Sequence, residues 1–355
     1  MGNKKTPFFE AEKKEGAFFT EFAGWYLPLH FGSAIQEALS VRQNAGFFDI
    51  SHMGRIKILG KDSEKLISKV FTRKPDQEKK GLYGFLVSED AKIIDDIVVF
   101  RKKEDEFFLV ANASGKEKDI ALLEYEKQKN LFQADIEDIS DKTVFVAIQG
   151  PKSQEKTVKI MSKFSPDLSQ KILEIKRFQF EEDGNVFISR TGYTGEDGFE
   201  IVMPKERAYE LWDEIKKREV RPCGLAARDI LRLEAGLILF GMDLTEETPP
   251  PFYSHLERFI SERAERFEIL KKRFEENPLY LKGIIFDSLP VPHPGAKTEP
   301  EGVISSAVFS AVLKKPIAFG WFKENLKEGT KIKVFIRNRI SEGTISKVPF
   351  FKNQK

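Results

Sequence analysis

Two adjacent carboxylates, Asp95 and Asp96, lie inside the otherwise apolar stretch Ile93–Val99. Side chains alternate between the two faces of a β-strand, so we expect these carboxylates to point in opposite directions and at least one to face a buried region. An ionised carboxylate in such a place needs a partner, because losing its hydration is costly. Two interpretations stay open: a structural ion pair, or a group that binds a ligand or moves a proton.

A second group of candidate residues lies in Arg190–Glu200, whose sequence is RTGYTGEDGFE. Arg190, Tyr193, Glu196 and Glu200 have side chains that could contact a ligand. The glycines between them permit positive φ angles and close backbone approach, so polar neighbours can be held at fixed angles. A surface hairpin with solvated charges is the alternative, because glycine-rich turns are common.

Two further polar residues are candidates for a site, Arg228 in a predicted helix and His52 in a strand that should be apolar. Arg228 and Asp229 begin a predicted helix, so Arg228 either forms an ion pair at the helix start or clamps a ligand carboxylate with two of its guanidinium nitrogens. His52 lies in the strand-like stretch FFDISHMG. For His52 we favour a hydrogen-bonded core histidine over a functional one.

The elements that must position these residues follow from the spacing of apolar side chains. FAGWYLPLHF (22–31) is expected to form a loop. Helices are predicted at residues 33–46, 62–71, 116–129, 153–164, 205–218, 226–241 and 261–277, the second with Asp62 as its N-cap. Strands are predicted at 47–60, 82–88, 93–102, 106–114 and 144–150, and residues 178–190 form a hairpin that turns at Asp183–Gly184.

The last third of the chain differs in composition. The proline-rich stretch 245–254 breaks regular structure and predicts a linker. Five short strands with Gly and Pro turns follow, at residues 281–287, 302–310, 316–322, 331–338 and 342–350, and these suggest a small β-barrel. The predicted fold class is therefore α+β, with an all-β C-terminal domain, and 355 residues fit two or three domains.

Composition excludes several classes of function. The formal net charge of +2 offers no basic field for nucleic acid. The single cysteine, Cys223, and four widely spaced histidines predict neither a disulfide nor a metal site. The sequence lacks an apolar run long enough to cross a membrane and an apolar leader, so we expect a cytoplasmic protein without a membrane partner.

Six motifs, in their order and spacing, resemble the aminomethyltransferase family, the T-proteins of the glycine cleavage system. They are FAGWYLPLHF, FFDISHMG, IIDDIVVF, AIQGP, RTGYTGEDGFE and CGLAARDILRLEAGL. The resemblance covers about residues 6–243 and resumes over the last 75 residues. It implies three domains in a ring around a folate pocket. We accordingly predict a folate-binding region at 1–245, made of two intertwined domains at about 1–140 and 141–245, then a linker and charged helix at 246–278 and a β-barrel at 279–355.

The resemblance also implies a reaction. Family members transfer a methylene unit from an aminomethyl-lipoyl arm on the H-protein to tetrahydrofolate, the co-substrate, with release of ammonia and without a metal. Asp96, the second aspartate of IIDD, matches the catalytic residue, which contacts the pterin nitrogens and orients or helps to deprotonate the attacking amine. The matching folate-binding positions are Tyr83, Asp96, Val110, Asn112, Tyr193, Glu200, Arg228 and Met53. Among these, Tyr193 would border the pterin, Glu200 would bind its amino edge, and Arg228 would hold the folate or its carboxylate tail.

The chain departs from the family pattern at residues 71–75 and 251–270, and Phe100 replaces a family tyrosine. These departures fall on the side that would admit the lipoyl arm, which leaves the one-carbon donor open. Two alternative functions therefore remain. One is a folate-dependent demethylase of another small donor, and the other is a non-catalytic folate-binding factor of the iron–sulfur maturation type.

Overall fold

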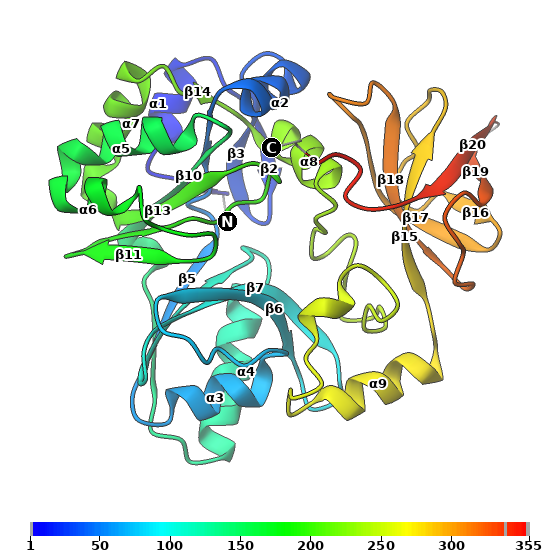
Figure 1. The fold of residues 1–355 in the computed structure, drawn as a ribbon, viewed down its shortest axis with the longest axis horizontal. Coiled ribbons are helices and arrows are strands. Elements are labelled where there is room, and N and C mark those ends of the chain that lie inside the picture. The colour runs from blue at the N-terminus through cyan, green and yellow to red at the C-terminus, as the bar shows by residue number, and fades with distance from the viewer. Residues whose placement is uncertain (1–2, 337–338, 353–355) are drawn as a thin grey trace.

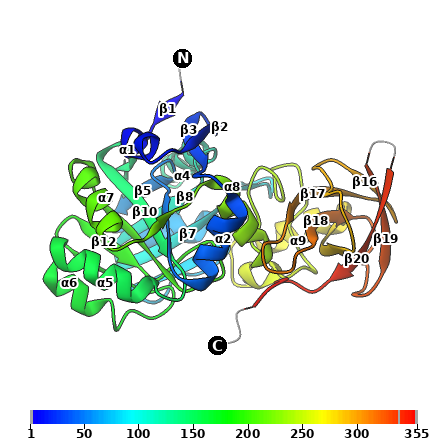
Figure 2. The same ribbon diagram turned by 90° about the horizontal axis from the view of Figure 1, so that it is seen from above.

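The computed structural model describes residues 3–336 and 339–352. Three bodies surround the middle of the molecule (Figure 1), and a view from above places the C-terminal barrel to one side, with α8 next to it (Figure 2). Regular elements of both kinds alternate along the first two-thirds of the chain, and a closed barrel follows. The predicted α+β class with a C-terminal barrel is confirmed. The predicted domain boundaries stay a prediction.

The first body is a six-stranded sheet with helices on one face. Its strands are β11 (Phe180–Asp183), β12 (Val186–Ser189), β13 (Gly198–Pro204), β10 (Thr143–Gln149), β4 (Gly46–Asp49) and β14 (Arg221–Pro222), in that spatial order. The helices are α1 (Phe9–Lys14), α5 (Ser153–Phe164), α6 (Pro166–Lys171) and α7 (Ala208–Lys217), which follows a 3₁₀ turn at Lys205–Arg207. Alternate residues of β10, such as Val146 and Ile148, pack under these helices, while Phe145 and Ala147 face the other way into a second apolar cluster.

The second body is a five-stranded sheet with the order β6 (Lys80–Val87), β7 (Ile93–Lys103), β8 (Glu106–Ala111), β5 (Gly54–Leu59) and β9 (Asp135–Asp138). Helices α3 (Ser63–Val70) and α4 (Lys116–Lys129) share an apolar cluster with one face, which includes Ile97 and Val99. The opposite face presents Phe100, Phe108 and Val110 to the free face of the first sheet, where they join a shared cluster. The two sheets are therefore packed through one common core, and a 3₁₀ turn at Ser140–Lys142 connects them.

The N-terminal segments cover one end of this common core. A small sheet of β1 (Lys4–Lys5), β3 (Trp25–His30) and β2 (Phe18–Phe22) precedes α2 (Ala34–Gln43), whose N-cap Ser33 accepts a hydrogen bond from the Gln36 amide. Residues 25–30 thus form a strand, and the predicted loop at 22–31 is wrong, because β3 pairs with both β1 and β2. The predicted continuous strand at 47–60 is also wrong: it divides into β4 and β5, which belong to different sheets.

The barrel closes with strand order β15 (Tyr280–Phe286), β18 (Pro316–Phe322), β17 (Gly302–Phe309), β16 (Lys297–Glu299), β19 (Lys331–Ile336) and β20 (Arg339–Ser346). Sequence patterning missed β16, which has only three residues and is too short to show alternation. The predicted strand at 331–338 reaches residues 337 and 338, which lie outside the described part of the chain.

The proline-rich linker is packed rather than free. Phe252, Leu256 and Ile260 are buried in the same apolar cluster as Phe85 and Trp321, so this segment joins the second body to the barrel. A 3₁₀ turn at Glu257–Phe259 lies within this segment, and the charged helix α9 (Phe267–Glu276) begins six residues later than residue 261, the predicted start.

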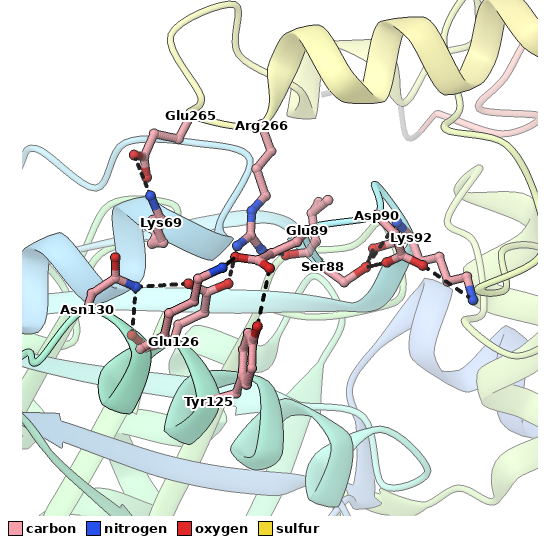
Figure 3. A network of polar contacts seen from close by, with 12 residues as sticks. Lys69, Ser88, Glu89, Asp90, Lys92, Tyr125, Glu126, Asn130, Glu265 and Arg266 are labelled. Atoms are coloured by element: carbon pink, nitrogen blue, oxygen red, sulfur yellow. Dashed lines mark hydrogen bonds and ion pairs between the residues drawn. The ribbon is translucent and has the colours of Figure 1, made fainter.

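A buried ion pair anchors the start of α9 to the second body. Arg266 donates hydrogen bonds to Glu126 of α4 and to the backbone oxygen of Val87, and Figure 3 shows it reaching down between α9 and α4. Nearby, an exposed ion pair joins Lys69 of α3 to Glu265, with 3.0 Å between Nζ and Oε1. These contacts fix the linker against the second body at two points.

Two other helix predictions need correction. The helix predicted at 226–241 is α8 (Leu225–Glu234), and the chain then turns through Gly236, whose φ of +74° ends the helix. Asp62 occupies the N-cap position of α3, but its side chain makes no cap hydrogen bond. The carboxylate binds Lys65 and the Gln133 amide instead.

Candidate active site

Asp96 lies on the face of the second sheet that looks toward the first sheet. The register pairs Phe85 with Asp96, Tyr83 with Val98, and Val98 with Val110, so all five side chains share that face. The Tyr83 hydroxyl donates to Asp96 Oδ2 over 2.8 Å, and Asn112 Nδ2 donates to Asp96 Oδ1 over 2.9 Å. The sheet and the residue that follows β8 therefore bring Tyr83, Asp96, Val110 and Asn112 close to one another.

Asp95 points to the opposite, helix-covered face, as strand alternation predicted. It accepts hydrogen bonds from the Asn112 backbone amide (2.9 Å), from Asn112 Nδ2 (2.7 Å) and from the Asp96 backbone amide (2.9 Å). No basic side chain forms an ion pair with Asp95 or Asp96 in residues 3–336 and 339–352. The structural ion pair considered for these carboxylates is therefore wrong for the described chain.

The environment of Asp96 favours the protonated carboxyl. Burial raises its pKa well above the usual range, and the neighbouring negative charge of Asp95 raises it further, while the hydrogen bonds from Tyr83 and Asn112 act in the opposite direction. Burial and the Asp96 charge likewise raise the pKa of the Tyr83 hydroxyl. A carboxyl with a raised pKa and two fixed donors is suited to exchanging a proton with a bound ligand.

The first sheet and its neighbouring loops supply the opposite wall. Glu200 of β13 is buried, accepts a hydrogen bond from Thr191 Oγ1, and has a pKa raised by burial. Tyr193 donates its hydroxyl to the Ile238 backbone oxygen, which fixes the ring. The glycine-rich segment is therefore not a solvated hairpin, because Glu200 and Thr191 are both less than one-tenth exposed.

Arg228 of α8 stands over the Tyr193 ring, with 4.7 Å from Cζ to the ring centroid. Its Nη2 lies 3.8 Å from the sulfur of Met53, and its buried Nη1 has no hydrogen-bond partner within the described residues. Among the charged groups nearby, Glu200 has the largest effect on the pKa of Arg228, although the two side chains form no ion pair within the described residues. The ion pair considered for the start of α8 is not made by Arg228; Asp229 pairs instead with Arg232, one turn later.

His52 lies beside Arg228 and is a neutral, buried histidine. Burial, together with the charges of Arg228 and Arg55, lowers its pKa to about 3. Its ring meets Phe22 edge-on at 6.0 Å, and its Nδ1 has no hydrogen-bond partner in the part of the chain described. The favoured core assignment is right about burial, and the expected hydrogen bond is not made by Nδ1 in that part.

The two walls face each other across the common core. The charge of Asp96 influences the pKa of Tyr193, and the ionisation of Tyr193 influences that of Tyr83, so these groups from different sheets lie within electrostatic range. The predicted site residues thus converge from two sheets, α8 and the Met53 turn.

Two acidic residues of the glycine-rich segment serve the fold. Asp197 binds Arg190 through two hydrogen bonds of 2.8 and 2.6 Å, and Arg190 also donates to the Ile175 backbone oxygen. Glu196 pairs with Arg42 at 2.8 Å. Arg190 and Glu196 are therefore held away from a ligand role, although their residue types suggested one.

Sequence reasoning missed Asp119, which lies under Asp95. The signal was present in α4, where Asp119, Leu123 and Glu126 recur at the spacing of one helical face and are all buried. Two of these three residues are acidic, so the buried face of the helix could not be recognised from apolar spacing.

The arrangement defines a class of protein: an α+β frame of two packed sheets, with candidate binding residues converging between them and a barrel appended at one side. No helix of the described residues is long and apolar enough to cross a membrane, and these residues contain no cluster of three or more potential metal ligands.

Comparisons with known proteins identify the family. Residues 8–263 match the GCVT N-terminal domain and residues 278–352 match the glycine cleavage T-protein C-terminal barrel domain. An aminomethyltransferase of Aquifex aeolicus is 38% identical over 358 residues, covering 98% of this chain and 96% of the relative. One of Thermoanaerobacter sp. is 36% identical over 373 residues, covering 98% of each chain. The crystal structure of the glycine cleavage system aminomethyltransferase T from Bartonella henselae has a TM-score of 0.89 and 30% identity, over 99% of both chains. The chain therefore belongs to the glycine cleavage T-protein family.

Proposed function

We propose that this protein is an aminomethyltransferase of the glycine cleavage type, which transfers a one-carbon unit from aminomethyl-lipoyl H-protein to tetrahydrofolate and releases ammonia. The observation that carries the proposal is the position of Asp96. Two fixed hydrogen bonds aim its carboxyl at the opposite wall, where Tyr193, Glu200 and Arg228 converge. The near-full-length match to aminomethyltransferases supports the same reaction over the demethylase and the non-catalytic alternative.

The chemistry of the side chains fits a folate. A pterin presents N–H donors along one edge, and the carboxyls of half-buried Asp96 and buried Glu200 are acceptors when ionised. A folate also carries carboxylates, and the unpartnered Nη1 of Arg228 offers a buried donor of the kind that binds them. Met53, Val110 and Tyr193 supply apolar surface beside these groups.

In this proposal each residue has a distinct task. Asp96 orients the attacking amine of tetrahydrofolate and exchanges its proton, while Tyr83 and Asn112 hold Asp96 in place. Glu200 binds the amino edge of the pterin, and Arg228 binds a folate carboxylate. Tyr193 and Met53 border the ring.

The segments that depart from the family pattern contact the strand that carries Tyr83. Thr72 accepts a hydrogen bond from the Phe85 amide and donates to the Phe259 backbone oxygen over 2.8 Å. Arg73 donates to the Tyr83 backbone oxygen over 3.1 Å, and the Phe259 ring packs against Tyr83 at 4.6 Å. The altered residues thus build the wall around Tyr83, and we propose that a cytoplasmic, lipoylated H-protein delivers its arm there.

Calorimetric titration with tetrahydrofolate, followed by an ammonia-release assay with aminomethyl-loaded H-protein, tests this function. Asp96→Asn should lower kcat about a hundredfold or more, because removal of a general acid–base group has that typical effect. Arg228→Met should weaken tetrahydrofolate binding about tenfold to a hundredfold, through loss of a charge-assisted hydrogen bond.

The matched control is Tyr125→Phe on the outer face of α4, where the side chain is 52% exposed. Failure of the wild type to bind tetrahydrofolate would refute the folate site. Binding without ammonia release from the loaded H-protein would refute the proposed donor, and other one-carbon donors would then be compared by mass spectrometry of the folate product.

A further inference from the structure

A second pair of carboxyl groups lies directly behind Asp96. Asp95 of β7 and Asp119 of α4 are both 0% exposed and meet between the sheet and the helix. Asp119 lies one helical turn after Gly115, the residue whose backbone packs against Asp95 Oδ2, and the two carboxyl groups influence each other's pKa. Two such carboxyl groups can form a hydrogen bond only when one of them carries a proton, because two carboxylates offer acceptors alone.

The neighbouring donors decide which carboxyl keeps the proton. Asp95 accepts three hydrogen bonds from N–H groups, two of them from Asn112 and one from the Asp96 backbone. Within the described residues, neither Asp119 oxygen accepts a hydrogen bond from an N–H or O–H donor of any other residue. N–H donors stabilise an anion, so a proton shared between the two carboxyl groups is favoured on Asp119.

Packing holds this pair in one geometry. Asp95 lies at the N-terminal end of α4, where a negative charge is favourable. A Cβ added at Gly115, the residue before that helix, would lie 2.6 Å from Asp95 Oδ2, so a glycine is needed for the carboxylate to approach the backbone.

The pair is connected to Asp96 through one amide group. Asn112 Nδ2 lies 2.7 Å from Asp95 Oδ1 and 2.9 Å from Asp96 Oδ1, so its two protons bridge the two carboxyls. We propose that Asp119 is a positioning residue of the active site: it keeps its proton, donates it in a hydrogen bond to Asp95, and through Asp95 and Asn112 holds Asp96 in its working orientation. This inference deepens the proposed function and rests on it for the role of Asp96.

The proton on Asp119 also limits the charge near Asp96. Burial and the charges of Asp95, Asp96 and Glu117 raise the pKa of Asp119 well above its usual range, and all three of these neighbours are acids. Loss of the proton would add a second buried negative charge to the one that already raises the pKa of Asp96. With Asp119 protonated, Asp95 orients Asn112 while only one buried negative charge, instead of two, lies behind Asp96.

Infrared difference spectroscopy tests the position of the proton. The spectrum of the wild type minus that of Asp119→Asn at neutral pH should contain the carbonyl stretch of a protonated carboxylic acid. Asparagine has the shape of the protonated acid and keeps a donor for Asp95, so this variant should fold. A difference spectrum without that band, or with only carboxylate bands, would overturn the inference.

Kinetics with tetrahydrofolate and aminomethyl-loaded H-protein test the positioning role. Asp119→Ala should lower kcat about tenfold to a hundredfold, with a KM for tetrahydrofolate within about threefold of the wild type, because a misplaced catalytic group costs this much. Asp119→Asn should restore most of that loss. Glu124→Gln, on the same helix with a side chain 34% exposed, is the matched control.

The two proposals fail in different ways. A wild type that binds tetrahydrofolate but releases no ammonia refutes the proposed donor, while the infrared measurement needs neither folate nor turnover and still locates the proton. An active wild type whose kcat survives Asp119→Ala in a folded protein overturns the positioning role alone. Equal losses of kcat in Asp119→Asn and Asp119→Ala would also overturn it, because they would show that Asp119 acts as an anion.

Discussion

The hydrogen bond from Tyr83 to Asp96 gives the sharpest test of the electrostatic reasoning. Tyr83→Phe removes one hydroxyl and keeps a ring to pack against Phe259, which meets the present ring at 4.6 Å. The lost bond is 2.8 Å long and stabilises the ionised Asp96, and Asn112 is then its remaining side-chain donor in the described residues.

The size of the effect follows from the bond. A hydrogen bond to a charged group contributes about 1.5–3 kcal/mol. One pKa unit corresponds to about 1.4 kcal/mol, so the pKa of Asp96 should rise by roughly one to two units. Because the ionised form accepts the proton from the folate amine, the acid limb of the kcat–pH profile should move to higher pH by the same amount.

The assay is the rate of ammonia release from aminomethyl-loaded H-protein, measured across the pH range with saturating tetrahydrofolate. Tyr125→Phe removes the same hydroxyl group from an exposed tyrosine on α4, so its profile should match the wild type. An acid limb that does not move in Tyr83→Phe would refute the assignment of that limb to Asp96.

Two further predictions concern stability. Arg266→Met should lower the free energy of unfolding by about 3–5 kcal/mol, because it leaves the Glu126 carboxylate buried without its ion-pair partner. Lys69→Met, at the neighbouring exposed ion pair, should lower it by about 0–1 kcal/mol. Urea unfolding of both variants measures the difference, and equal losses would contradict the prediction. Glu12 is buried without a hydrogen-bond partner in the described chain, and burial together with the charge of Asp49 raises its pKa well above the usual range. The folded protein therefore holds this proton to higher pH than the unfolded chain, and stability falls as the pH rises above the unfolded pKa of about 4.3. Glu12→Gln should remove that loss, so the free energy of unfolding should change less between pH 5 and pH 8 than it does in the wild type. An unchanged pH dependence would show that Glu12 does not contribute to it.

Local patterns predicted many elements because their causes are local. The helices at 116–129 and 153–164 match α4 and α5, since apolar spacing and helix-forming residues act within a few turns. The hairpin at Asp183–Gly184 formed as predicted, because Gly184 takes the positive φ that the turn requires. The opposite orientations of Asp95 and Asp96 followed from strand geometry alone.

Errors arose where distant partners decided the structure. Residues 47–60 look like one apolar strand, but β4 pairs with β10 while β5 pairs with β8 and β9, so the chain crosses from one sheet to the other at His52–Met53. The proline-rich linker looks like a free connection, yet Phe252 packs in a cluster with Phe85 and Trp321. Neither pairing nor packing of this kind leaves a mark in the local sequence.

The candidate site shows the same division. The sequence by itself determined the carboxylates of the IIDD strand, the polar glycine-rich segment and, through the order of its motifs, the family. Only the tertiary structure decided that Asp119 lies under Asp95, that Arg228 has an unpartnered donor beside Tyr193, and that Arg190 is bound by Asp197. Hydrogen bonding and desolvation depend on groups brought together across the core, and a linear pattern carries residue types without carrying those neighbours.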